Sequence, residues 1–196
     1  MTAAEPLLVT LLRHGDVDGR PFVFRGAADP PLAASGWTQM ERAYARAAAP
    51  PPDRIATSPL ARCRVFAEQA AARAGRAAIV ASDLAEMRFG AWEELTADEA
   101  RALDAVRYDA FRRDPRSATP PEGETYDAFA ARVERVLREL CDGHAGHLLI
   151  VTHAGVMRVV LAQALGLAPA AIQRIALPAA ATCRLSLLAG ESPVVL

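Results

Sequence analysis

The sequence of 196 residues predicts an α/β fold in three layers, α/β/α, with helices on both faces of a mostly parallel sheet. Short apolar runs alternate with amphipathic helical patterns, as expected of parallel strands joined by crossover helices. Two strands predicted near the end of the chain, 172–177 and 182–188, follow each other without a helix, so one sheet edge is predicted to be antiparallel. The length, with no linker or repeat, predicts a single domain over residues 1–196.

The other elements are predicted from hydrophobic periodicity and from residues that start or end helices. Short apolar runs predict strands at 7–12, 54–57, 77–81 and 148–151. Apolar residues at three- and four-residue spacing predict helices at 36–48, 59–75, 96–104, 126–140 and 155–165, with Ser35, Ser58, Thr96 and Thr125 as N-caps. Residues 16–33 are predicted to form a long functional loop, and the polar stretch 105–123 to form a surface segment or lid.

Charge and composition exclude several classes of function. The chain has 22 Lys and Arg against 23 Asp and Glu, so no overall field attracts nucleic acid or an anionic membrane. The apolar runs are too short to span a membrane, and the N-terminus lacks the basic segment of a secretory signal. Three cysteines without paired spacing indicate free thiols, which predicts a cytoplasmic protein. His144 and His147 flank a glycine turn and are predicted to be surface residues, so no metal or other cofactor is expected. The oligomeric state stays open.

Cationic and imidazole side chains follow three of the predicted strands at the point where each strand ends. Arg13 and His14 follow the first strand, and His153 follows the strand at 148–151. Arg62 lies one helical turn beyond Ser58, which follows the strand at 54–57. Open α/β sheets bind ligands outside the carboxyl ends of their strands, so these groups are predicted to converge on one crevice. Two guanidiniums and two imidazoles suit a phosphate monoester.

Transfer of a phosphoryl group also needs a nucleophile and a proton donor. The imidazole of His14 can carry a group covalently. Glu86 is the preferred donor, because its apolar neighbourhood is expected to raise the pKa of the carboxyl group. Glu93, Glu94 and Glu122 compete with it on sequence alone.

Five blocks of the chain form a recognisable series. They are, in order, Leu12-Arg13-His14-Gly15, Thr57-Ser58-Pro59-Leu60-Ala61-Arg62, Leu84-Ala85-Glu86 with Phe89-Gly90-Ala91-Trp92-Glu93, Gly123-Glu124-Thr125 and Val151-Thr152-His153-Ala154-Gly155. This series resembles the histidine phosphatase superfamily, also called phosphoglycerate mutase-like. The likeness is strongest to α-ribazole phosphatases and related small-molecule phosphatases.

The resemblance implies a phosphoglycerate mutase-like fold and a phosphatase that needs no metal. It implies that His14 takes up the phosphoryl group as a phosphohistidine, which water then hydrolyses. Arg13, Arg62 and His153 would hold the phosphate, and Glu86 would donate the proton. The implied substrate is a small phosphorylated metabolite, with α-ribazole 5′-phosphate as one candidate.

The chain departs from the family pattern at two places. After Arg-His-Gly the family often has Glu-Thr or Glu-Ser and then an Asn, whereas this chain has Asp16-Val17 and no Asn. Arg20 or Arg25 is expected to replace that contact, with Arg25 as a substrate contact. Glu94 stands where the family usually has Gly, and it is expected to alter the pocket rim.

Two alternatives to a phosphatase remain on the sequence alone. A phosphoglycerate mutase would move phosphate between positions of its substrate, but the chain lacks the longer insertion and the Ser-x-Trp-Asn run of those enzymes. A protein that binds phosphorylated ligands without catalysis would fit the altered loop after Gly15, but the full set of candidate catalytic residues argues against it.

Overall fold

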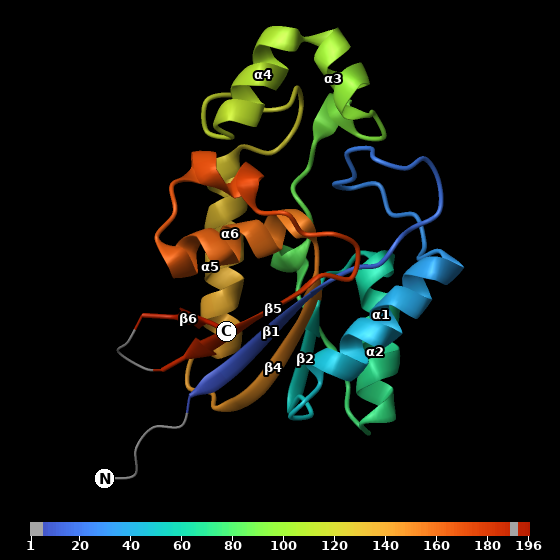
Figure 1. The fold of residues 1–196 in the computed structure, drawn as a ribbon, viewed down its shortest axis with the longest axis vertical. Coiled ribbons are helices and arrows are strands. Elements are labelled where there is room, and N and C mark those ends of the chain that lie inside the picture. Colours follow the sequence, from blue (N-terminus) through green and yellow to red (C-terminus); the bar gives the residue numbers. More distant parts are fainter. Residues whose placement is uncertain (1–5, 189–191) are drawn as a thin grey trace.

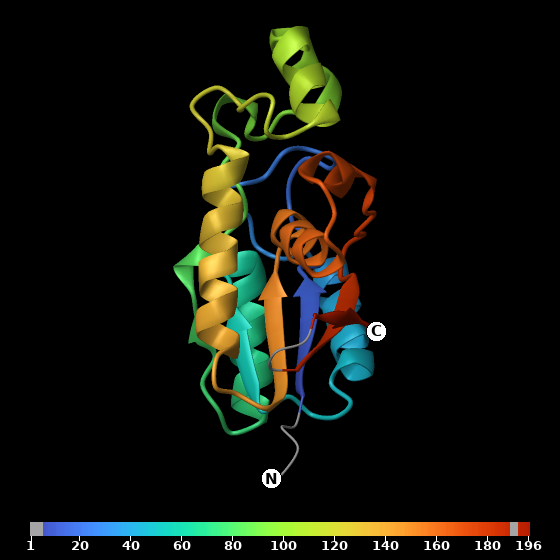
Figure 2. The same cartoon turned by 90° about the vertical axis from the view of Figure 1, so that its left-hand side faces the viewer.

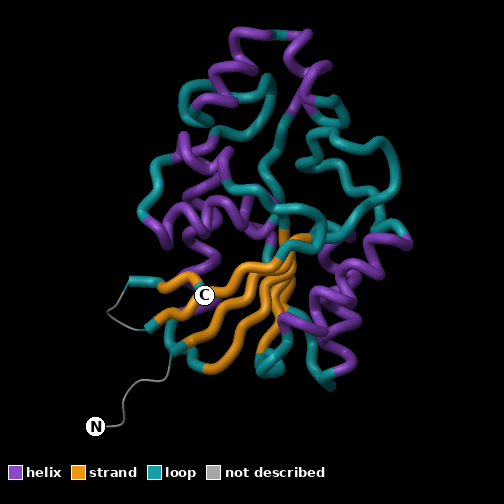
Figure 3. The backbone as a smooth tube through the Cα atoms, in the orientation of Figure 1, coloured by secondary structure: helices purple, strands orange, loops and turns teal. Residues whose placement is uncertain are grey.

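A computed structural model describes residues 6–188 and 192–196, so the predicted absence of a leader at residues 1–5 lies outside the described residues. The strands form one mixed sheet in the order β3-β2-β4-β1-β5-β6, with β5 and β6 antiparallel to their neighbours (Figures 1 and 3). The strands are β1 (Leu7–Arg13), β2 (Arg54–Thr57), β3 (Ile79–Val80), β4 (Gly146–Thr152), β5 (Thr182–Leu187) and β6 (Val194–Val195). The predicted parallel sheet with an antiparallel edge is confirmed.

Helices cover both faces of this sheet and complete the predicted three layers (Figures 1 and 2). Helices α1 and α2 pack on one face, and α5 and α6 pack on the other. Successive residues of β4 alternate between these two cores, because side chains in a strand point to opposite faces. The helices are α1 (Ala34–Ala47), α2 (Ala61–Arg73), α3 (Ala97–Leu103), α4 (Ala105–Arg113), α5 (Tyr126–Cys141) and α6 (Ala154–Leu165). The short 3₁₀ helices are η1 (Ser82–Leu84), η2 (Gly90–Trp92) and η3 (Pro169–Arg174).

The strand register aligns the three carboxyl ends that matter for the site. β1 pairs with β4 so that Arg13 lies beside Thr152, and β2 pairs with β4 so that Thr57 lies beside Val151. Backbone hydrogen bonds continue past the strand ends, since the amide of His14 donates to the carbonyl of Thr152 at 2.9 Å. The residues after β1, β2 and β4 therefore leave the sheet side by side.

Two of the four predicted N-caps are confirmed. The hydroxyl of Thr125 accepts from the amide of Ala128 at the start of α5, and Thr96 forms a capping box with Glu99 at the start of α3. The other two are wrong. Ser35 lies inside α1 and its hydroxyl donates to Asp16. Ser58 precedes α2 by three residues, and its hydroxyl accepts from the amide of Leu60 at 3.2 Å and lies 2.7 Å from Nε2 of His153.

Other local predictions are wrong where tertiary contacts outweigh sequence pattern. The stretch 105–123, predicted as a surface segment or lid, contains the helix α4, which the sequence pattern did not predict and which buries Tyr108 and Phe111 against Trp92. Residues 172–174 of the predicted strand 172–177 belong to the 3₁₀ helix η3, and residues 175–177 have no regular structure. β3 is shorter than the strand predicted at 77–81. The sequence pattern also missed β6, which extends the antiparallel edge.

His147 is buried, contrary to the predicted surface position. Its Nδ1 donates to the carbonyl of Pro50 at 2.7 Å, and its Nε2 lies 2.8 Å from the hydroxyl of Thr10. These partners account for both ring nitrogens, so the imidazole is a satisfied core group. The described residues contain no cluster of three or more His, Cys, Asp or Glu placed to hold a metal ion. In this same part of the chain, each helix is too short or too polar to cross a membrane.

Helices α3 and α4 stand above the carboxyl ends of the parallel strands and form a cap over them (Figures 1 and 2). The long loop 16–33 reaches the same cap. Isolated bridges join Val23 to Thr96 and Phe24 to Glu93, and Arg20 pairs with Glu99 at 2.8 Å. The cap and the loop together enclose the space outside the strand ends, where the candidate site lies.

Candidate active site

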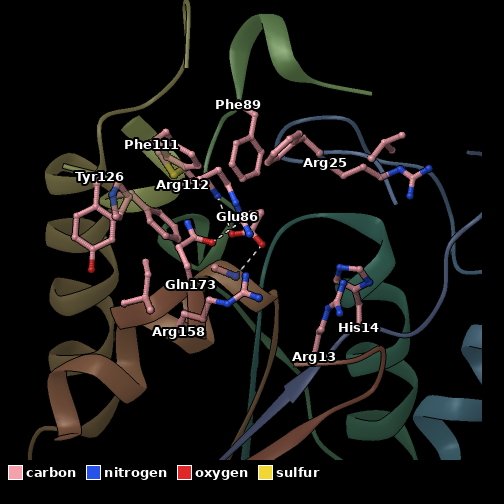
Figure 4. Close-up of a pocket in the computed structure, with 17 residues that line it drawn as sticks. Arg13, His14, Arg25, Glu86, Phe89, Phe111, Arg112, Tyr126, Arg158 and Gln173 are labelled. Atoms are coloured by element: carbon pink, nitrogen blue, oxygen red, sulfur yellow. Dashed lines mark hydrogen bonds between the residues drawn. The ribbon is translucent and has the colours of Figure 1, made fainter. Parts of the chain in front are cut away.

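The strand ends bring the two predicted imidazoles together. The ring centroids of His14 and His153 lie 5.3 Å apart, with the ring planes inclined at 62°. Arg13 immediately precedes His14 and lines the same pocket (Figure 4). Parallel pairing of β1 with β4 sets this proximity, because it places the two strand ends at equal height.

The surroundings of His14 fix its tautomer. Its Nδ1 lies 2.8 Å from the carbonyl oxygen of Gly15, which can only accept a hydrogen bond. Nδ1 therefore carries the proton and Nε2 keeps a free lone pair. Burial lowers the pKa of His14 to about 3, and the charges of Arg13 and Arg62 lower it as well. The imidazole of His14 is thus uncharged at neutral pH, and a free lone pair on Nε2 is what a nucleophilic imidazole needs.

Arg62 is fully buried beneath the loop 16–33. Its two Nη atoms donate to the carbonyls of Ala28 at 2.6 Å and Gly26 at 3.1 Å, while Asp29 lies 3.4 Å away. Arg13 donates through Nη1 to the carbonyl of Leu177 at 2.5 Å. The buried Nε of each arginine has no acceptor within the described residues. Arg13 lines the pocket with His14, whereas Arg62 is not among its lining residues. An unsatisfied buried N–H group of a guanidinium is suited to bind an anion.

His153 is fully buried and is not among the residues that line the pocket. Its Nε2 lies 2.7 Å from the hydroxyl of Ser58 and 3.6 Å from Sγ of Cys63. Burial lowers its pKa strongly, and the charge of Arg62 and the ring of His14 lower it further. His153 is therefore uncharged as well. Burial raises the pKa of the Cys63 thiol, so Cys63 is an unreactive core residue.

Glu86 lines the pocket, and backbone amides orient its carboxylate. Oε1 accepts from the amide of Met87, and Oε2 accepts from the amide of Gly155 at the start of α6, each at 3.0 Å. Its carboxylate faces the same cavity as Arg13 and His14 (Figure 4). This is the geometry that a proton donor to a leaving group needs.

The three competing carboxylates have other surroundings. Glu93 accepts from four backbone amides, those of Gly26, Ala27, Ala28 and Phe89, at 2.9–3.3 Å. It therefore fixes the loop whose carbonyls hold Arg62. Glu94 pairs with Arg25 on the rim, and Glu122 is exposed. Among these four glutamates, only Glu86 lines the pocket.

Glu94, one of the two departures from the family pattern, pairs with Arg25. Glu94 adopts a φ of 60°, a conformation that favours glycine, which accounts for the usual Gly at this position. Its carboxylate accepts from Nε of Arg25 at 3.1 Å. Arg25 lines the pocket, but its guanidinium is directed to Glu94 and to the carbonyl of Arg20. Arg20 is exposed and pairs with Glu99, away from the pocket.

Sequence reasoning missed a buried arginine that holds the segment carrying Glu86. Arg132 on α5 donates to the carbonyls of Asp83, Ala85 and Glu86 at 2.7–2.9 Å. It also forms two hydrogen bonds, each 2.8 Å, with the carboxylate of Glu124. The Gly-Glu-Thr block is thus part of a clamp on the backbone of Glu86. No local sequence signal joins residues that are 46 positions apart.

The pocket itself has a volume of about 210 Å³ and is lined by aromatic rings as well as charges. Sequence reasoning also missed Arg112, Arg158 and Gln173 in its wall. Arg112 was assigned to the polar stretch and Gln173 to a strand. Arg158 had a usable signal, because it follows Gly155 by three residues and therefore shares its helical face.

Comparison with known proteins agrees with this geometry. The model of the histidine phosphatase superfamily (branch 1) matches residues 9–196. The chain belongs to the histidine phosphatase superfamily. It is 30% identical over 162 residues to the adenosylcobalamin/alpha-ribazole phosphatase of Escherichia coli, covering 80% of this chain and 78% of the relative.

Solved structures show the same relationship. The mycobacterial glucosyl-3-phosphoglycerate phosphatase in complex with VO3 superposes with a TM-score of 0.84 and 25% identity, over 96% of each chain. The alpha-ribazole phosphatase of Shigella flexneri superposes with a TM-score of 0.79 and 26% identity, over 92% of this chain and 94% of that one. This histidine phosphatase is therefore a phosphoric monoester hydrolase with a phosphoglycerate mutase-like fold.

Proposed function

We propose that this histidine phosphatase hydrolyses a small phosphorylated metabolite through a phosphohistidine on Nε2 of His14. Nε2 attacks phosphorus, and the bond between phosphorus and the ester oxygen breaks as the N–P bond forms. Glu86 gives its proton to the departing alcohol oxygen. Water then attacks the phosphohistidine, Glu86 takes up the proton of that water, and inorganic phosphate leaves His14 free.

The tautomer of His14 carries this proposal. The hydrogen bond from Nδ1 to Gly15 leaves Nε2 as the free lone pair, and the lowered pKa keeps it unprotonated at neutral pH. Arg13, Arg62 and His153 are the proposed phosphate-binding groups. The unsatisfied Nε atoms of both arginines support that role. Replacing Arg62 is expected to lower the rate by about 10²–10³-fold, by analogy with the loss of an oxyanion donor.

The relatives suggest which substrates to test first. α-Ribazole 5′-phosphate is a candidate because the E. coli and Shigella relatives are named alpha-ribazole phosphatases. A phosphorylated sugar acid is another, because a structural relative is a glucosyl-3-phosphoglycerate phosphatase. A panel of phosphorylated metabolites, assayed for released phosphate without added metal, compares them directly. Phosphate exchange within a phosphoglycerate, without release, would instead indicate mutase activity.

Trapping the intermediate tests the mechanism. Quenching during turnover of a ³²P-labelled ester is expected to leave acid-labile, base-stable phosphate on His14. His14→Ala is expected to lose both this label and the activity, because it removes the nucleophile. His144→Ala is the matched control, since His144 is exposed and outside the pocket. Wild-type turnover by His14→Ala would contradict the mechanism.

A further inference from the structure

We infer that the alcohol portion of the substrate carries a carboxylate, and that Arg112 and Arg158 bind it within the same pocket. This inference rests on the proposed function, since it assigns the phosphate to His14. In Figure 4, Arg112 and Gln173 lie on the side of the pocket away from His14, and Arg158 extends from α6 toward its middle. The pocket thus has a phosphate end and a second cationic end.

The charges that line the pocket are unbalanced. Arg13, Arg112 and Arg158 form no ion pair within 4.0 Å in the described part of the chain. Glu86 is the one carboxylate, among the described residues, that lines this cavity. Burial lowers the pKa of Arg158. The charge of Glu86 opposes that shift, while those of Arg13 and Arg112 add to it. The positive charges of these arginines therefore repel one another within one pocket, and an anionic ligand would reduce that repulsion.

Both guanidiniums are held in place and still have free donors. Nη1 of Arg112 donates to Oε1 of Gln173 at 2.7 Å, and Nε of Arg158 donates to the carbonyl of Ile175 at 3.1 Å. No other hydrogen bond from either guanidinium occurs within residues 6–188 and 192–196. Because a guanidinium is planar, a hydrogen bond from one of its N–H groups also orients the others. The remaining N–H groups are then suited to bind a planar carboxylate. The two arginines come from α4 and α6, so the cap and the core each supply one.

The size of the pocket indicates a compact substrate. Its volume of about 210 Å³ is below the roughly 300–1,000 Å³ of pockets that enclose drug-sized ligands. Phe89, Phe111 and Tyr126 contribute apolar walls to this pocket. A phosphorylated hydroxy acid fits this arrangement, whereas α-ribazole 5′-phosphate has no second anionic group. The inference therefore ranks a compact carboxylated ester above α-ribazole 5′-phosphate.

Two esters that differ only by the carboxylate test the inference. Phenyl phosphate and 4-carboxyphenyl phosphate are compared by kcat/KM, and the corresponding phosphonates are compared by calorimetric Kd. The wild type is expected to prefer the carboxylated member in both assays by about tenfold or more, as lost charge-assisted hydrogen bonds predict. Arg158→Gln and Arg112→Gln are each expected to remove most of that preference, because kcat/KM falls much more for 4-carboxyphenyl phosphate than for phenyl phosphate.

Arg113→Gln is the matched control, because Arg113 neighbours Arg112 on α4 but does not line the pocket. It is expected to keep the preference. Equal affinity of the wild type for both phosphonates would overturn the inference, and so would equal losses on both esters in Arg158→Gln. Phosphonate selectivity without any hydrolysis would uphold the carboxylate site and refute the proposed function. Hydrolysis of both esters without selectivity would uphold the proposed function and refute the carboxylate site.

Discussion

Arg132 offers the sharpest test of how this fold holds its site. Its side chain is 15% exposed and that of its partner Glu124 is 6% exposed, so Arg132→Met leaves a carboxylate buried without its counter-ion. Breaking a buried ion pair from one side costs about 3–5 kcal/mol. For a chain of this length, each kcal/mol lowers Tm by about 2–4 °C, so Tm is expected to fall by about 6–20 °C.

Arg135 provides a matched control on the same helix. It also pairs with the segment before Glu86, through the carboxylate of Asp83 at 2.6 Å, but its side chain is 54% exposed. An exposed pair contributes about 0–1 kcal/mol, so Arg135→Met is expected to lower Tm by at most about 4 °C. Arg132→Met with Glu124→Gln is expected to recover part of the loss, because the unpaired charge is then removed.

Thermal denaturation by circular dichroism measures these differences, and urea titration gives the free energy of unfolding. The kcat of folded Arg132→Met is expected to fall more than its KM rises, since the carbonyl of Glu86 loses its anchor. Arg132→Lys keeps the charge beside Glu124 but cannot reach all three carbonyls, so it is expected to be intermediate in Tm and in kcat. Equal Tm changes in Arg132→Met and Arg135→Met would refute the clamp.

Two further predictions concern titration and proton transfer. Burial lowers the pKa of His14 to about 3 and lowers that of His153, whereas the unfolded imidazoles take up protons below about pH 6.5. The contribution of these neutral imidazoles to the free energy of unfolding is complete above pH 6.5. As the pH falls toward 3, the free energy of unfolding is therefore expected to decrease by up to about 1.4 kcal/mol per pH unit for each imidazole. Urea titrations at several pH values should give a smaller slope for His14→Ala, and an unchanged slope would contradict the assignment. Glu86→Gln is expected to lower kcat about 10²–10⁴-fold for alkyl phosphates. The loss is expected to be much smaller for 4-nitrophenyl phosphate, because 4-nitrophenolate departs without taking up a proton. Equal losses on both substrates would exclude Glu86 as the proton donor.

The sequence predictions are correct where local pattern defines an element, and they fail where contacts between distant residues define it. The strands 7–12, 54–57 and 148–151 and the helix after Thr125 are confirmed, because burial periodicity and a local cap define them. The helix α4 was missed, because its polar sequence becomes helical through contacts of Tyr108 and Phe111 with the distant Trp92. His147 was misplaced for a similar reason. Its partners Thr10 and Pro50 are far away in the chain.

The sequence by itself determined the class of fold and the approach of His14 to His153, because parallel strands end at one edge of the sheet. Arg13 lines the pocket with His14, whereas Arg62 is buried against the loop 16–33 and is not among the residues that line the pocket. Only the tertiary structure decided that Glu86 lines the pocket, that Arg132 holds it, and that Arg112 and Arg158 face the same cavity. Those choices depend on which side chains the cap, η3 and α6 bring within a few ångströms, and contacts between distant segments carry no local periodicity.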